Sequence, residues 1–439
     1  MADSSSRVRT TLRALRHRNF QLFFAGQLIS LIGTWMQNVA QAWLVYRITG
    51  SSALLGMVGF AGQIPVFFIS PLGGLIADRY SRQRTVIATQ TSAMILAFIL
   101  AGLTLTGRVQ VPHIFVMAAL LGVVNAFDIP ARQSFLVEMV GREDLINAIA
   151  LNSSMFNGAR IVGPAVAGIL VAAIGEGWCF FANGVSYIAV IIGLMMIKVP
   201  PTATPKKGSA MSHIAEGFRF AARTTPIRAL LLLLGLVSLT GMPYAVLMPV
   251  FADHIFHSGA RGLGILMGFS GAGALIGALA LATRQGVIGL GRWVAVSTGV
   301  FGASLILFSL SRSFWVAAAL LVPVGLAMMT QMGASNTLIQ TMTPDPLRGR
   351  VMSVYSMMFM GMAPLGALLA GVMADRFGAP FTVAAGGAVA IVGSIVFSLR
   401  LPALRPEARR LIAAQHMVAG DPADEVTSQG EAVDLIKRT

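Results

Sequence analysis

The sequence predicts an all-α membrane protein in which twelve transmembrane helices form two six-helix, pseudo-symmetric bundles. The first observation behind this prediction is composition: 56% of the 439 residues are hydrophobic and only 11% are charged, against about 25% in ordinary soluble chains. So few charges cannot cover a surface in water, so lipid must cover most of it. The other two observations are the length of the apolar runs and an internal repeat.

The apolar runs are long enough to cross a bilayer, which takes about 20 residues of helix. Barrel strands would instead show short alternating segments, and the polar, basic start of the chain argues against a cleavable signal peptide. Twelve such runs stand in the sequence, at residues 20–46, 52–77, 85–106, 112–137, 147–174, 178–198, 228–251, 260–283, 292–310, 314–340, 350–374 and 380–399.

These spans divide the chain into five parts. We expect a cytoplasmic tail (1–19), an N-terminal bundle (20–198), a cytoplasmic linker (199–227), a C-terminal bundle (228–400) and a disordered cytoplasmic tail (401–439). In the linker, apolar and basic residues fall on opposite faces, which predicts an amphipathic helix at the membrane surface.

The positions of the basic residues predict the topology. Most of the 32 Lys and Arg residues lie in the two tails, the linker and every second loop; the exceptions are Arg47, Arg108, Arg261, Arg312 and Arg376 in the other loops, and Arg160 inside a span. The positive-inside rule then places both termini and the linker in the cytoplasm. We therefore expect a multi-pass protein of a bacterial inner membrane, and the net charge of +15 indicates topology rather than nucleic-acid binding.

The two halves of the chain repeat. The run from Gly163 to Gly175 matches the run from Gly366 to Gly378 at a shift of 203 residues, the difference between positions 163 and 366. Repeats of this length build two bundles around a central path.

Two motifs resemble those of the major facilitator superfamily. The run Gly74-Leu-Ile-Ala-Asp78-Arg79-Tyr-Ser-Arg82-Gln-Arg84 resembles its loop signature, with Ser81 where Gly is usual, and Ala159 to Gly168 resembles its antiporter motif, with Ala at two Gly positions. The run Asp128-Ile-Pro-Ala-Arg132-Gln resembles the sequences of one branch of this superfamily, the enterobactin exporters and macrolide-efflux proteins. The resemblance covers about residues 10–400 and implies the major facilitator fold and a gating role for Asp78.

Asp78 ends the second span on the predicted cytoplasmic side. A carboxylate there can cap a facing helix N-terminus, and the candidate helix is span eleven of the other half, which starts near Arg350. We expect Asp78 to form a cytoplasmic gate with Arg79, Arg82 and Glu138. The alternative is a solvated charge cluster that only sets topology. The corresponding loop of the second half lacks an acid, so this latch is expected to be one-sided.

Asp128 and Arg160 are the charges placed well inside spans, where a charge is costly and indicates function. Their counterparts at the repeat shift, Gln331 and Ala363, are neutral. Three hypotheses stay open: a structural ion pair between the two, proton exchange at Asp128, or anion binding at Arg160.

Span one carries a polar stripe along one helical face. Such a face must contact protein or water, so it either bonds to other helices or lines a water-filled path. We expect the substrate cavity to be lined by Gln27, Thr34, Gln37, Asn38, Gln41, Asn125, Asn157, Gln331 and Asn336. Pro164 and Pro364 should bend spans five and eleven.

The sequence has no pair of His residues at metal-ligand spacing, no phosphate-binding loop and no nucleophile elbow in a loop. We therefore expect no enzyme, no cofactor and no metal. We predict a secondary active transporter that exports small amphipathic molecules, drug- or siderophore-like, by alternating access and with proton coupling; export itself follows from the resemblance. The expected partners are the small-molecule substrate, membrane lipid and protons, for a monomeric chain. The alternatives are a lipid or lysolipid flippase and a non-transporting receptor or regulator.

Overall fold

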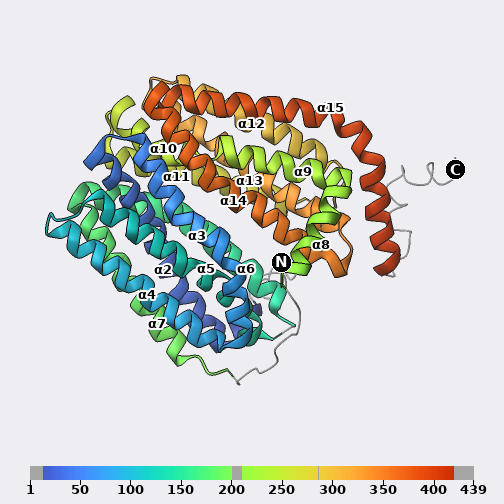
Figure 1. Cartoon of the computed structure of the whole chain (residues 1–439), viewed down its shortest axis with the longest axis horizontal. Coiled ribbons are helices and arrows are strands. Elements are labelled where there is room, and N and C mark those ends of the chain that lie inside the picture. Colours follow the sequence, from blue (N-terminus) through green and yellow to red (C-terminus); the bar gives the residue numbers. More distant parts are fainter. Residues whose placement is uncertain (1–12, 142, 200–209, 285, 420–439) are drawn as a thin grey trace, which may run out of the picture.

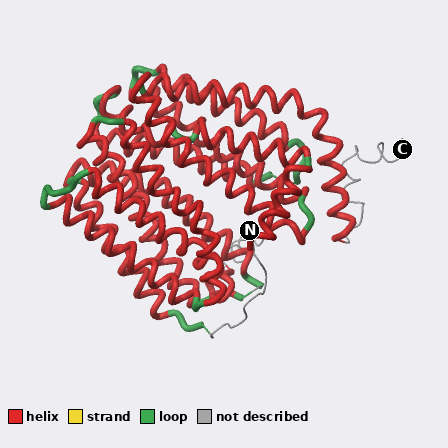
Figure 2. The backbone as a smooth tube through the Cα atoms, in the orientation of Figure 1, coloured by secondary structure: helices red, strands yellow, loops and turns green. Residues whose placement is uncertain are grey.

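The structure is a computed structural model that describes residues 13–141, 143–199, 210–284 and 286–419, with some side chains in these ranges, those of Asp78 and Asn157 among them, outside the description. The regular elements in these ranges are all helices (Figure 2), which confirms the predicted class. Eleven helical stretches among them are long and apolar enough to cross a membrane. The first predicted span has the length as well, but its row of polar residues lowers its mean hydropathy.

The N-terminal half forms one group of six long helices, preceded by a short turn, η1 (Arg13–Arg16). These helices are α2 (Arg18–Thr49), α3 (Ser52–Arg79), α4 (Arg82–Leu105), α5 (Val111–Val140), α6 (Leu145–Ile174) and α7 (Glu176–Met196). Within the group, α3 packs on α5, α2 on α6 and α7, and α4 on α7.

The C-terminal half forms a second group, joined to the first by the linker helix α8 (Ala210–Arg223). Its long helices are α11 (Gly259–Ala282), α12 (Leu290–Leu310), α13 (Phe314–Met342), α14 (Asp345–Phe377) and α15 (Ala379–Ala419). Span seven is broken into α9 (Thr225–Leu236), η2 (Val237–Gly241), α10 (Tyr244–Val250) and η3 (Phe251–Ile255).

Span seven, rather than span five or eleven, carries the irregular backbone. The segments η2 and η3 are π-helical, and π turns are found mostly inside α-helices at functional sites. Pro243 and Pro249 stand in the same span, and each lacks the backbone N–H that a regular helix needs. Helices α6 and α14 run without interruption through Pro164 and Pro364.

The two halves touch mainly along two helix pairs, α3 with α14 and α6 with α11, and α10 adds contacts with α2 and α3. Glycines allow the backbones to approach: a Cβ at Gly168 would lie 2.7 Å from the Gly264 Cα, and one at Gly56 would lie 2.4 Å from the Ala367 oxygen. Figure 1 shows the bundles close together at the end that carries α10 and diverging toward the end that carries α8. We call these ends the far side and the linker side.

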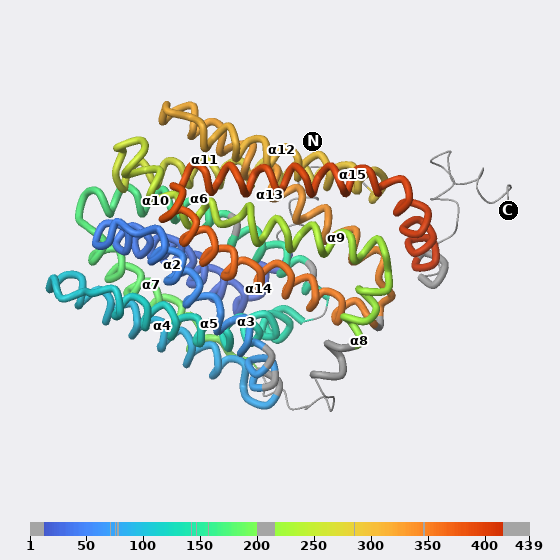
Figure 3. Tube along the Cα trace, turned by 45° about the horizontal axis from the view of Figure 1, so that its top comes forward, coloured from blue at the N-terminus to red at the C-terminus, as the bar shows by residue number. Residues whose placement is uncertain are grey.

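The expected disordered tail (401–439) is wrong for its first part. Helix α15 continues past residue 400 to Ala419, and residues 420–439 lie outside the described part. Leu401 and Leu404 are buried in the core of the C-terminal group, which explains why the helix persists. Figures 1 and 3 both show α15 turning as it leaves the bundle, and Pro402 and Pro406 stand inside the helix at that point.

Asp144 anchors the segment before α2, a role that the sequence analysis missed. Its carboxylate forms ion pairs with Arg13 Nε at 2.9 Å and Arg16 Nη2 at 2.8 Å, and it accepts a hydrogen bond from His17 Nε2 at 2.7 Å. The side chain is only 2% exposed. The His17 hydrogen bond, ahead of the two Arg charges, lowers the pKa of Asp144 against the opposing effect of desolvation.

We expect Asp144→Asn to release the N-terminal segment, seen as several-fold faster tryptic cleavage after Arg13 and Arg16 at pH 7. Because the folded pKa of Asp144 is lowered, its stabilisation is complete above the ordinary value of 3.8 and is lost as pH falls through the folded value. The melting-temperature difference from the wild type should therefore vanish in strong acid. Glu143→Gln, an exposed neighbour, is the control and should change neither readout.

Candidate functional site

The polar stripe of α2 divides into two parts. Gln37 and Thr34 bond to the neighbouring helix α7: Asn183 Nδ2 donates to Gln37 Oε1 at 2.7 Å, and the Thr34 and Tyr187 hydroxyls lie 3.3 Å apart. For these two residues the structure shows the interhelical bonding that was the alternative to a water path. Asn38 is exposed and Gln41 partly exposed, so these two remain available to a substrate.

Gln27 and Gln331 are buried amides with free polar atoms. Gln27 is 2% exposed and Gln331 is 1% exposed. Among the described residues, Oε1 of Gln27 and both amide atoms of Gln331 have no hydrogen-bond partner. Burying such a group without a partner costs about 1–3 kcal/mol, so both positions suit a bound water or a polar group of a ligand.

Two further predicted cavity residues can be placed, and one cannot. Asn125 lies partly buried on α5. The Oδ1 atom of Asn336 accepts from Gln340 within α13. The side chain of Asn157 lies outside the description.

Asp128 pairs with Arg132, not with Arg160. Arg132 Nε lies 3.3 Å from Asp128 Oδ2, and the two residues are one turn apart on α5, where i and i+4 side chains meet. Thr89 Oγ1 and Gln90 Nε2 on α4 donate to Asp128 Oδ1 at 2.8 and 2.9 Å. The hypothesis of an Asp128–Arg160 ion pair therefore fails, because Asp128 faces α4.

Arg160 lies at the middle of α6, roughly 20 Å from either end at 1.5 Å per residue. Among the described residues it makes no ion pair and no hydrogen bond. The neighbouring Ile161 packs on Gly271 of α11, so this stretch of α6 faces the other half. Tyr244 of α10 lies within electrostatic range of the guanidinium.

The predicted gate on the linker side is partly assembled. Arg82 Nη1 lies 2.7 Å from Glu138 Oε1 and also donates to the Ser134 carbonyl at 3.4 Å. Arg79 is exposed at the end of α3, and the side chain of Asp78 lies outside the description.

The start of α14, which Asp78 was expected to cap, is contacted by the linker helix. Glu216 of α8 forms an ion pair with Arg350, and Gly217 packs on the Arg350 backbone.

A carboxylate latch closes the far side, and the sequence analysis missed it. Asp375 at the end of α14 accepts from the Ser52 backbone N–H at 2.6 Å and from Ser51 Oγ at 2.9 Å, at the start of α3. A negative charge is favoured at a helix N-terminus. The expectation of a one-sided latch is thus wrong, because the second acid comes from α14 rather than from the loop near Arg284.

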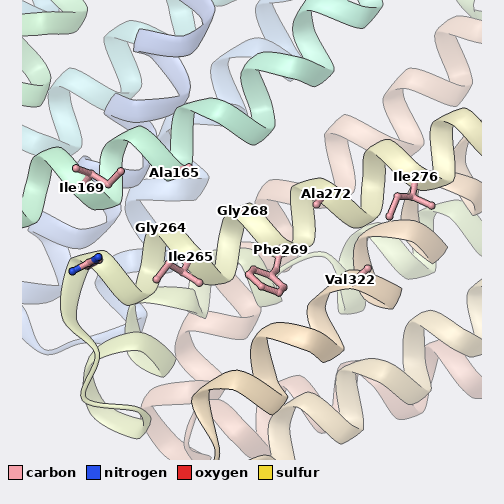
Figure 4. A pocket seen from close by; sticks show the side chains of 10 residues that line it. Ala165, Ile169, Gly264, Ile265, Gly268, Phe269, Ala272, Ile276 and Val322 are labelled. Atoms are coloured by element: carbon pink, nitrogen blue, oxygen red, sulfur yellow. The ribbon is translucent and has the colours of Figure 1, made fainter.

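A pocket of ≈ 520 Å³ lies between α6 and α11 on their outer surface. Figure 4 shows Ala165 and Ile169 facing Gly264, Gly268 and other α11 residues across it. Its lining is apolar except for Arg261, and Ile169 is 62% exposed. It is therefore a lateral, membrane-facing pocket and not a central one.

Comparisons with known proteins agree with this architecture. A family model described as transmembrane secretion effector matches residues 9–433. The multidrug efflux pump Tap of Mycobacterium tuberculosis is 31% identical over 410 residues, covering 88% of this chain and 94% of Tap. The staphyloferrin A transporter of Staphylococcus aureus is 26% identical over 376 residues, covering 85% of this chain and 94% of that protein.

Two further matches extend the comparison. The enterobactin exporter EntS of Citrobacter koseri is 26% identical over 399 residues, covering 90% of this chain and 93% of EntS. The crystal structure of the nucleoside transporter NupG superposes with a TM-score of 0.68 at 14% identity, covering 88% of this chain and 98% of NupG. At that identity the superposition shows the major facilitator fold alone.

We expect Asp128→Asn and Arg132→Gln each to destabilise the protein by about 3 kcal/mol, since each leaves the other group of a buried pair uncompensated. The double variant should recover most of the loss, measured as melting temperature in detergent. Arg84→Gln, an exposed residue, is the control. Additive losses in the double variant would show that the pair is not coupled.

We expect Asp375→Ala to weaken far-side closure by about 1 kcal/mol, the contribution of a helix cap, or about a fivefold change in the ratio of closed to open molecules. Spin labels at Arg108→Cys and Arg312→Cys, exposed in far-side loops of the two halves, would report it as a longer distance. The native Cys179 is buried and should stay unlabelled. Asp253→Asn, an exposed far-side acid, should leave the distance unchanged.

Proposed function

The chain belongs to the transmembrane secretion effector family of the major facilitator superfamily, and on that premise we propose that it exports small amphipathic organic molecules by alternating access. As a member it is a multi-pass transporter and not an enzyme. Tap, EntS and the staphyloferrin A transporter are named for drug or siderophore transport, which supports a drug- or siderophore-like cargo.

One observation carries the mechanism: the two halves are latched together on the far side and diverge on the linker side. The Asp375 cap and the glycine contacts both lie at the closed end. We place the linker side in the cytoplasm, of a bacterial inner membrane, from the distribution of basic residues. The arrangement is then open to cargo from the cytoplasm, the state that an exporter needs for loading.

The return step uses the same pair of helices. Helices α3 and α14 run antiparallel, so the end of α3 with Asp78 faces the start of α14. We propose that Asp78 caps α14 when the far-side latch opens, and that Glu216 leaves Arg350 at that point. The contact between the linker helix α8 and α14 would then be present when the far side is closed and absent when the linker side is closed.

Proton coupling is assigned to Asp128. It is a buried acid inside a span of the N-terminal group, 3% exposed, and it pairs with Arg132 and accepts hydrogen bonds from Thr89 and Gln90. Taking up a proton would remove the charge that holds Arg132. We propose that this release couples the proton gradient to movement of a single, monomeric chain.

A flippase is the second candidate, because the lateral pocket between α6 and α11 is apolar with Arg261 in its lining. Such a pocket suits an acyl chain, with the headgroup phosphate at the Arg. It lacks the polar floor that a path for headgroups needs, so export of soluble amphipaths is the better supported function.

We expect purified protein in liposomes to transport an amphipathic dye when a pH gradient is imposed across the membrane, with the dye flux measured by fluorescence. Asp128→Asn should lose this flux and retain dye binding, whereas Glu143→Gln should keep both. A receptor would move no dye, and a flippase would instead move a fluorescent lysolipid between leaflets.

A further inference from the structure

Arg160 is a positive charge at the middle of helix α6 with no counter-ion among the described residues. The other charges deep in the N-terminal group, Asp128 and Arg132, neutralise each other. The spans of the C-terminal group carry charged residues only at their ends. Among the described residues nothing pairs with Arg160, whose side chain is partly buried, and a charge inside a membrane span is costly unless it is paired.

Arg160 faces the seam between the two halves and not the lipid. On α6, the exposed residues Val162 and Ile169 mark the lipid face, because residues seven apart lie on nearly the same side of a helix. Arg160 lies about half a turn away from them. Gly163 packs on Trp35 of α2 and Ile161 on Gly271 of α11, so Arg160 lies between the faces that contact α2 and α11.

An aromatic pair lies next to it. Phe156 is one turn before Arg160 on the same face of α6 and is 43% exposed. Its ring meets the Trp35 ring edge to face, with centroids 5.7 Å apart. Two rings beside a guanidinium offer contact to a flat apolar body and to an anionic group of the same molecule.

We propose that Arg160, with Trp35 and Phe156, is the cargo-binding site, and that the cargo is an amphipathic organic anion whose carboxylate or comparable anionic group pairs with the guanidinium. This inference rests on the proposed export function and narrows its substrate class. The planar guanidinium binds a carboxylate through two parallel hydrogen bonds. The cargo thus supplies the counter-ion that Arg160 lacks among the described residues.

The test uses two dyes with the same xanthene body and opposite charge: carboxyfluorescein, an anion, and rhodamine 6G, a cation. Binding to the purified full-length protein is measured by fluorescence anisotropy in detergent, and flux is measured in liposomes. We expect the wild type to bind carboxyfluorescein at least tenfold more tightly than rhodamine 6G.

Three variants separate charge from geometry. Arg160→Gln should lose about tenfold in affinity for carboxyfluorescein and keep or gain affinity for rhodamine 6G. Arg160→Lys retains the charge without the planar pair of donors and should lie between. Arg108→Gln, exposed in a far-side loop, should match the wild type. Monodispersity and melting temperature verify folding, and Arg160→Lys serves as the test if Arg160→Gln does not fold.

The outcomes distinguish this inference from the function on which it rests. Equal binding of both dyes, or full anion affinity in Arg160→Gln, overturns the anion site, and dye flux in the same samples would leave export standing. Selective, Arg160-dependent binding of the anion supports the site even where no dye is moved, a result that would count against export instead.

Discussion

The hydrocarbon interior supplies no hydrogen-bond partners, so each polar group inside it must be satisfied by the protein. This constraint explains much of the arrangement of the N-terminal group. Gln37 accepts a hydrogen bond from Asn183. Asp128 accepts hydrogen bonds from Thr89 and Gln90 and forms an ion pair with Arg132. Among the described residues, the groups that escape it include Arg160 and the amides of Gln27 and Gln331. They are the informative ones, because the cost of leaving them unpaired calls for a ligand or water.

The second organising feature is the pairing of α3 with α14. Both helices end on the same run of residue types, Gly74-Leu-Ile-Ala-Asp78-Arg79 in one and Gly371-Val-Met-Ala-Asp375-Arg376 in the other. Because the helices are antiparallel, the two acids lie at opposite ends of one contact. In the structure Asp375 holds the far end, and α8 contacts the end that Asp78 would hold.

Span number and the division into two groups could be predicted because hydropathy and length decide them without tertiary detail. The side-chain pairs could not, since they depend on how each helix is rotated about its axis. Asp128 and Arg132 are an exception, because their i, i+4 spacing is visible in the sequence and predicts their pairing once both lie in one helix. The tail beyond residue 400 was misjudged because its charges outweighed Leu401 and Leu404, which are buried.

The glycine contacts between the halves have a mechanical consequence. Where the backbones of Gly168 and Gly264 meet, no side chains interlock, so one helix can roll on the other with little resistance. The contacts lie toward one end of the helices, so the opposite end is the long arm of a lever. Across a bilayer core roughly 30 Å thick, a rotation of about 10° moves that end by about 5 Å. A small rearrangement at the short arm is thereby amplified where cargo enters.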